Sequence, residues 1–203
     1  ELGRAFPGTR IRTSSGERVL PTVGAEAEIV VATPGAEPVA DGGYAAVVLL
    51  DTWLLLSRVG LRAGEEALRR WANAAALARP GATVLAVGAP AHPALQALVR
   101  WDPAGFAARE TTERMEAHLP PASRLATITG DPGAVDDAAT LLAPPPGAEV
   151  LGPVDLADGE SRVVVRVPRA QGAALSAALA ELQRLRSSRK LDAVRVQVDP
   201  PTL

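Results

Sequence analysis

The stretch Tyr44–Asp51 is the feature that most constrains the fold of this chain. It is a short apolar run with Val47 and Val48 at its middle, Gly42-Gly43 before it and a carboxylate at its end. Its length and the preceding glycines favour a strand buried on both faces over a helix segment, although periodicity alone does not separate the two. We therefore expect a strand at the centre of the fold.

Two further apolar runs flank this stretch. Glu28–Thr33 precedes it and Thr83–Gly88 follows it, and an amphipathic segment from about Arg62 to Ala78 separates it from the later run. On that segment the spacing predicts an apolar stripe of Leu68, Trp71 and Ala75, and ion pairs of Glu65 with Arg69 and of Glu66 with Arg70. A strand, a helix and a second strand in the same direction form a βαβ unit, which predicts a parallel sheet and an α/β fold.

Proline and glycine set the predicted ends of the elements. Arg79-Pro80-Gly81 is predicted to end the amphipathic helix, with Arg79 as the cation in its last turn. The first residues, Glu1–Phe6, resemble the end of a helix before Pro7-Gly8, and a strand is expected near Thr9–Thr13. Because Glu1 is not an initiator, we expect the chain to be a fragment.

Two more helices and a boundary follow. We expect helices over Ala94–Arg100 and over about Pro103–His118, the second with Phe106 and Met115 on its apolar side. Pro120-Pro121 then changes the pattern. The sequence therefore predicts two domains, residues 1–118 and residues 122–203.

The second domain is predicted to be a small α+β sandwich with both helices on one face. Asp131-Pro132 is a favourable helix start, because it places a cap acceptor before a proline in the first turn. The expected βαββαβ elements are Leu125–Thr129, Asp131–Leu142, Glu149–Leu156, Arg162–Val167, Ala170–Arg189 and Ala193–Val198.

Several classes of function find no support in the residues. Lys190 is the only lysine and no glycine-rich loop precedes it, so no phosphate-binding Walker motif is present. His92 and His118, the only histidines, lack the spacing of a catalytic triad or a zinc site, and there is no cysteine. No apolar run reaches the roughly 20 residues that span a bilayer. We expect a cytoplasmic protein with no catalytic residue, no metal ligand and no membrane contact.

The charges are distributed unevenly. Residues 131–160 hold seven acidic side chains and no basic one, whereas residues 161–195 hold eight basic and two acidic ones, in a chain of net charge −2. The basic run predicts contact with DNA phosphates, without base stacking because no aromatic residue follows Met115. The alternatives are that these cations complement a helix end or pair with the acidic run. The candidate DNA-binding residues are Arg162, Arg166, Arg169, Arg184, Arg186, Arg189 and Lys190.

The order of segments resembles the C-terminal part of the primosomal replication-restart proteins of the PriA (primosomal protein N′) family, in its actinobacterial form. The segments that carry the resemblance are Glu1–Gly8, Ala91–Leu98, Leu119–Pro121, Val150–Pro153 and Val198–Pro200. The resemblance implies a RecA-like second helicase lobe for residues 1–118 and a C-terminal domain that contacts DNA forks or single strands. It also implies as partners the single-strand-binding protein and other primosome proteins. ATP with magnesium, and zinc, would be bound by upstream regions.

The departures from the family's helicase motifs suggest a scaffold. Ala32–Pro38 stands where active members carry a Gly-Thr-Gln loop, and Ala72–Arg79 stands where they carry two phosphate-binding arginines. Ala76 replaces the first arginine, so Arg79 is the one candidate nucleotide contact. Loss of such an arginine typically costs about 10³–10⁵ in rate.

We expect a DNA- and partner-binding module. The alternative is part of an active ATP-dependent 3′-5′ DNA helicase whose nucleotide site lies mainly in another lobe, and a small-molecule enzyme on a Rossmann-like sheet has less support.

Overall fold

The computed structural model describes residues 2–58 and 60–200, and the chain separates into two compact units. Unit 1 is Glu1–Phe106 and unit 2 is Ala107–Leu203, so the division falls inside helix α5, Pro103–Glu116. The predicted autonomy of residues 122–203 stays a prediction.

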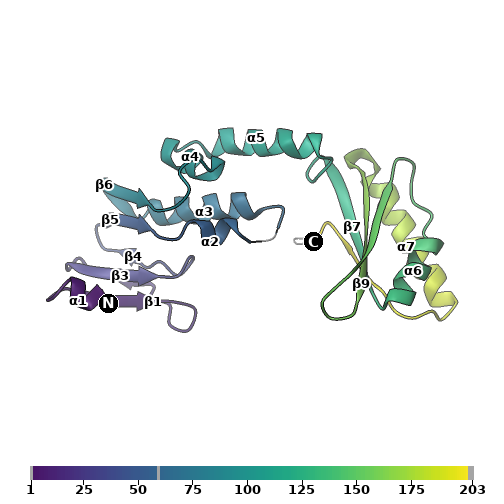
Figure 1. Ribbon diagram of the computed structural model, residues 1–203, viewed down its shortest axis with the longest axis horizontal. Helices are drawn as coiled ribbons and strands as arrows, with labels where there is room; N and C mark the ends of the chain where they lie inside the picture. The colour runs from purple at the N-terminus through teal and green to yellow at the C-terminus, as the bar shows by residue number, and fades with distance from the viewer. Residues whose placement is uncertain (1, 59, 201–203) are drawn as a thin grey trace. The chain divides into compact units, whose positions relative to one another are not determined.

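Unit 1 contains three pairs of parallel strands. They are β1–β3, β2–β4 and β5–β6, and β5 and β6 are joined by helices α2 and α3 (Figure 1). The predicted βαβ unit and the mixed α/β class are therefore confirmed. The elements are α1 Leu2–Ala5, β1 Arg10–Ser14, β2 Thr22–Val23, β3 Glu28–Ala32, β4 Val39–Ala40, β5 Tyr44–Leu49, α2 Trp53–Leu56, α3 Ala63–Ala75, β6 Ala78–Ala86 and α4 Pro93–Arg100, followed by the start of α5.

The core of unit 1 lies between its helices and one face of β5–β6. Leu68 and Trp71 of α3 pack there with Leu95 of α4 and with Phe106 of α5. His92 caps the start of helix α4, and its Nδ1 accepts a hydrogen bond from the Ala94 N–H at 3.2 Å. The predicted stripe on α3 and the inward position of Phe106 are confirmed.

Three local predictions in this part of the chain are wrong. The strand Tyr44–Leu49 is not buried on both faces: Val48 is 52% exposed, because the helices cover only one side of it. Arg79 lies in β6 and not in a helix, since the N–H of Tyr44 already donates to the Leu77 carbonyl at 2.9 Å. Met115 is 58% exposed. It stands nine residues after Phe106, which at about 3.6 residues per turn places it on the opposite side of α5.

Unit 2 is a four-stranded antiparallel sheet with two helices on one face. Its strand order is β10–β7–β9–β8, and Figure 1 shows α6 and α7 on the same side of the strands. The predicted βαββαβ order is confirmed. Its elements are β7 Ser123–Gly130, α6 Pro132–Leu141, β8 Glu149–Asp155, β9 Ser161–Pro168, the 3-10 turn η1 Arg169–Gln171, α7 Gly172–Ser188 and β10 Arg195–Val198.

Alternation along the strands builds the core of unit 2. Paired residues such as Ala126 with Val165, and Ile128 with Val163, face the helices and are almost fully buried. Leu175, Leu179 and Leu182 of α7 fill the space above them. Helix α6 begins as predicted, with the Asp131 carboxylate accepting a hydrogen bond from the Gly133 N–H at 3.0 Å. The opposite face of β9 carries two of the predicted DNA-binding arginines.

Candidate nucleic-acid interface

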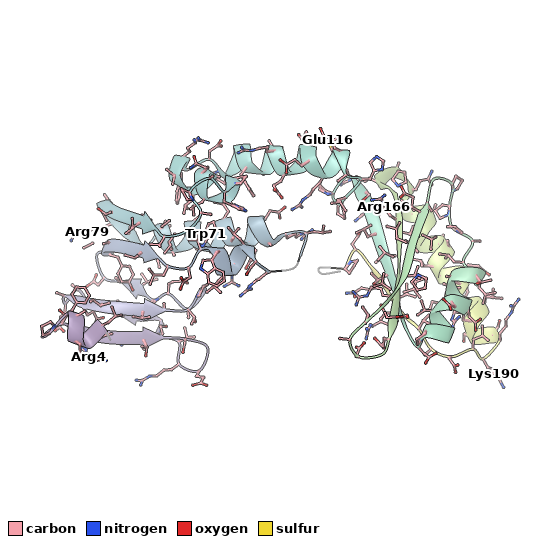
Figure 2. All side chains as sticks on the ribbon, in the orientation of Figure 1. Arg4, Trp71, Arg79, Glu116, Arg166 and Lys190 are labelled. Atoms are coloured by element: carbon pink, nitrogen blue, oxygen red, sulfur yellow. The ribbon has the colours of Figure 1, made fainter. Side chains whose placement is uncertain are left out.

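The seven predicted cations fall into two groups at different places in unit 2. Arg162, Arg166 and Arg169 belong to β9 and the turn η1 after it, whereas the other four lie near the end of α7. Figure 2 shows Arg166 and Lys190 at opposite ends of this unit. The sheet and the helix therefore do not combine all seven cations into one cluster.

Arg166 is held by contacts within unit 2. Its guanidinium donates to the Glu149 carboxylate at 2.6 Å, across the β8–β9 pair, and to the carbonyls of Ala117 and His118 at 3.3 and 3.4 Å. Arg169 lies on the surface, and its Nη1 donates to the Pro121 carbonyl at 3.1 Å. Both side chains tie the segment before β7 to the sheet.

Arg162 lies on the helix-free face of the sheet. Its Nε donates to the hydroxyl of Thr129 at 3.2 Å, and Thr129 is also the register partner of Arg195. Arg195 forms an ion pair with Glu160 at 3.1 Å. Arg195 belongs to the basic run but not to the predicted site. Its position beside Arg162 depends on the pairing of β10 with β7, which the sequence alone does not reveal.

The end of α7 presents the cations with the fewest partners. Arg184 forms an ion pair with Glu181 at 2.6 Å. Arg189 and Lys190 are exposed, and neither side chain has a hydrogen-bond or ion-pair partner within residues 2–58 and 60–200. Lys190 adopts a left-handed backbone conformation with φ of 53°, which ends the helical segment and directs the chain towards β10.

Arg186 is buried, at 3% exposed, and is not placed to meet a phosphate. Its Nη2 donates to the Asp192 carbonyl at 2.6 Å, while its Nε and Nη1 have no partner among the described residues. The spacing of Leu175, Leu179 and Leu182 continues to position 186, so Arg186 falls on the inward stripe of the helix. That spacing is the sequence signal that could have identified it.

The acidic run supplies part of the neutralisation, as the alternative interpretation of the charges proposed. Glu149 pairs with Arg166 and Glu160 pairs with Arg195, and these four residues come from the two oppositely charged runs. A further ion pair joins Arg124 of β7 to Asp199, which follows the end of β10. Among the candidate site residues, Arg189 and Lys190 are the two whose side chains have neither an ion pair nor a hydrogen bond within the described part of the chain.

Unit 1 holds the single candidate nucleotide contact, Arg79, on the exposed strand β6 (Figure 2). An open cleft of about 480 Å³ lies elsewhere in the unit and includes Arg12 and Asp41 in its wall, but not Arg79. Within the described residues there is no group of three or more histidine, cysteine, aspartate or glutamate side chains that could hold a metal ion. The described helices include none that is long and apolar enough to cross a membrane.

The carboxyl group of Glu66 and the phenol of Tyr44, both in unit 1, have shifted pKa values. Hydrogen bonds from Arg69 and Arg70 lower the pKa of Glu66 to about 2, whereas burial, and secondarily the charge of Glu28, raises the pKa of Tyr44. The Tyr44 hydroxyl donates to the Pro38 carbonyl at 2.9 Å. Both groups are accounted for by contacts inside the unit and give no indication of catalysis.

Comparison with known proteins shows which family the chain resembles. The family model described as "Primosomal protein N C-terminal domain" matches residues 115–201. The "Probable replication restart protein PriA" of Mycobacterium leprae is 47% identical over 218 residues, which cover 98% of this chain and 33% of that protein. The proteins of the same name from Mycobacterium tuberculosis and Mycobacterium bovis are 45% identical over 227 residues, covering 98% of this chain and 34% of theirs.

The chain therefore spans about one third of the length of the curated relatives it matches. The similarity includes unit 1 as well as unit 2, because it extends over nearly all of the 203 residues. On these grounds the chain belongs to the PriA family of replication restart proteins, and residues 115–201 form its primosomal protein N C-terminal domain.

Proposed function

We propose that this chain is the DNA- and partner-binding part of a replication restart protein of the primosome. Unit 2 binds the phosphate backbone of DNA, and unit 1 is a RecA-like second helicase lobe that serves as a scaffold after losing its nucleotide motifs. Family membership and the parallel pairing of β5 with β6 support this assignment. Such a protein acts in the cytoplasm.

The observation that carries DNA binding is the pair of exposed cations at the end of α7. Arg189 and Lys190 stand side by side with no carboxylate partner, in a chain with an overall net charge of −2. Arg184 lies on the same helix end and can add charge there, whereas Arg162 is on the helix-free face of the sheet. Arg166, Arg169 and Arg186 hold the fold of unit 2. All aromatic residues precede Met115, so contact is with phosphates and not with stacked bases.

The double variant Arg189→Glu/Lys190→Glu tests this proposal. Each lost phosphate contact lowers the slope of log affinity against log salt by about 0.9 for duplex and 0.7 for single strands. We expect the slope to fall by roughly 1.8 or 1.4, equally for unrelated sequences, with fluorescence anisotropy on forks and on single strands as the measurement. Arg186 is left unchanged, because a carboxylate at its buried position would disturb folding.

The matched control is Arg4→Glu/Arg18→Glu, which changes the net charge by the same amount at two exposed positions of unit 1. It should leave the slope within error of the wild-type value. An equal loss in both variants would show that only net charge matters, and an unchanged slope in the α7 variant would contradict phosphate binding at this site.

We also propose the single-strand-binding protein and other primosome proteins as partners, on the basis of family membership alone. Calorimetric titration of the purified single-strand-binding protein into this chain tests the first of them. A lack of measurable heat and of co-elution would exclude a direct contact with these 203 residues.

The nucleotide part of the proposal is that this chain neither binds nor hydrolyses ATP. Its only lysine is in unit 2, and Arg79, its candidate nucleotide contact in unit 1, is not among the residues that line the cleft of about 480 Å³. The chain has no cysteine, so its residues do not fit the family's zinc either. Calorimetric binding of magnesium-ATP that disappears in Arg79→Ala would overturn this part and favour the helicase alternative.

A further inference from the structure

Strands β5 and β6 present four apolar side chains side by side on one face. Val48 and Leu85 are register partners, and Leu50 and Val87 follow them by two residues each. The pairing continues past the strand ends, because the Val87 N–H donates to the Leu49 carbonyl at 2.9 Å. These four side chains, called the β5–β6 patch below, are 52%, 54%, 68% and 47% exposed for Val48, Leu85, Leu50 and Val87.

The opposite face of the same strands is covered. Leu49 and Ala86, which alternate with the patch, pack against the core that α3 and α4 complete. The outward positions before the patch are Ala46 and Thr83, so the whole outward row carries no charge. The bare face thus repeats the aliphatic character of the buried one but lacks the helices that cover it.

A bare apolar face is unusual for strands paired in this way. Parallel sheets occur almost only with both faces covered, and contiguous exposed aliphatic side chains mark surfaces that another element covers. A nucleic acid is a poor occupant, because the outward row offers neither a cation for phosphates nor an aromatic ring for bases. The side chains of the patch therefore favour contact with an uncharged, aliphatic protein surface.

The relatives indicate where such a surface comes from. They match 98% of this chain, yet the matched part is only about a third of their own length. We propose that the β5–β6 patch is an internal docking surface, covered by an aliphatic element from the part of the longer replication restart polypeptide outside these 203 residues. The proposal depends on family membership and is independent of DNA binding by unit 2.

Hydrogen exchange read by mass spectrometry tests it in two proteins, the 203-residue chain and the longer natural polypeptide that contains it. Peptides over residues 44–49 and 83–87 should exchange roughly tenfold or more slowly in the longer protein, since a covered patch gains the burial of several aliphatic side chains. Val48→Gln/Leu85→Gln should remove that extra protection while leaving exchange in the 203-residue chain unchanged. The control Val99→Gln, on α4 and 73% exposed, should leave both proteins unchanged.

Equal exchange of these peptides in the two proteins would overturn the proposal, because the face would then be bare in the longer protein as well. Sedimentation of the 203-residue chain supplies the second reading. A dimer that Val48→Gln/Leu85→Gln dissociates would make a second copy the occupant and would equally overturn the proposal, whereas a monomer at all concentrations supports it.

Discussion

Units 1 and 2 both place helices against strands, but they cover those strands to very different extents. In unit 2 the inward residues Val163, Val165 and Val167 of β9 are each at most 1% exposed. In unit 1 the paired residues Val48 and Leu85 remain about half exposed. Of the twenty large apolar side chains that are exposed within the described residues, fifteen lie in unit 1. Unit 2 therefore closes its core with its own residues, and unit 1 does not.

The type of sheet explains the difference. An antiparallel sheet tolerates one face without helices, and in unit 2 that face carries the partly exposed Arg162 and Arg166, with the buried Thr129 beneath Arg162. Parallel strands lack this alternation of polar and apolar positions, so the row Val48, Leu50 stays apolar although it is bare. A sheet face without helices is therefore polar in unit 2 and apolar in unit 1.

The first prediction concerns independent folding and has the largest expected effect. Unit 2 alone, residues 107–203, should unfold in a single cooperative urea transition monitored by far-ultraviolet circular dichroism, because its core cluster is complete within it. Residues 1–106 alone should show a broad transition and bind hydrophobic dyes. If residues 1–106 unfold cooperatively and residues 107–203 are unfolded, unit 1 and not unit 2 has the complete core. The fragment 122–203 tests whether the second domain folds when it begins at the predicted boundary.

The second prediction compares one aliphatic truncation in each unit. Ile128→Ala, at a fully buried position in unit 2, should lower the free energy of unfolding by about 2–5 kcal/mol. Leu85→Ala, at a position 54% exposed in unit 1, should change it by less than about 0.5 kcal/mol.

The two transitions can be followed separately in the intact chain. All three tryptophans, Trp53, Trp71 and Trp101, lie in unit 1, so tryptophan fluorescence reports that unit, and circular dichroism reports both. Comparable losses for Ile128→Ala and Leu85→Ala would show that the β5–β6 patch is covered within this chain.

Most of the helices and strands could be predicted from the sequence in both units, but the burial of the strands in unit 1 could not. The valine-rich run Arg162–Val167 and the Asp131-Pro132 helix start are local signals, and the structure has both elements within a residue or two of the predicted bounds. The strand Tyr44–Leu49 was also found from local pattern. Its burial depends on which elements cover it, and no local pattern reports that.

Three other errors have equally specific causes. Met115 follows Phe106 by nine residues, a half-turn offset that puts the two side chains on opposite sides of α5. A cation followed by Pro-Gly usually ends a helix, but at Arg79 pairing with β5 begins one residue earlier, at Ala78. Arg186 has the helical spacing of the buried leucines, so its charge alone does not place it on the surface. The ion pairs of Arg166 and Arg195 required the strand register, which only the fold supplies.

The third prediction concerns Arg186, the buried cation of the otherwise apolar α7 stripe. Arg186→Met should leave the stability of unit 2 within about 1 kcal/mol of wild type, since replacing a buried charge by an apolar side chain of similar size is often neutral or stabilising. Urea unfolding by circular dichroism measures it, and DNA affinity should not change. A loss of DNA affinity without a loss of stability would make Arg186 a phosphate contact after all and would return it to the interface.

The last prediction concerns Glu66, and its effect is the smallest. The sequence predicted ion pairs of Glu66 with Arg70 and of Glu65 with Arg69, but the structure has both arginines on Glu66, with Arg69 Nη2 at 2.8 Å and Arg70 Nε at 2.6 Å. Arg70 also donates to the Pro34 carbonyl at 2.7 Å, which ties α3 to the loop after β3.

These contacts make the stability of unit 1 depend on pH in a defined direction. The pKa of Glu66 is about 2 in the folded chain against 4.5 as its ordinary value, so the charged carboxylate stabilises the fold above pH 4.5 and loses that effect as the pH falls towards 2. Because Glu66 is partly exposed, Glu66→Gln should cost no more than about 1 kcal/mol at pH 7, and the difference from wild type should shrink through this window. Urea midpoints from tryptophan fluorescence at several pH values measure it.

Glu181→Gln, which removes the Arg184 pair of unit 2, should leave that fluorescence transition unchanged. A Glu66→Gln difference that stays constant, or grows, below pH 4.5 would mean that the two arginines do not hold this carboxylate in solution.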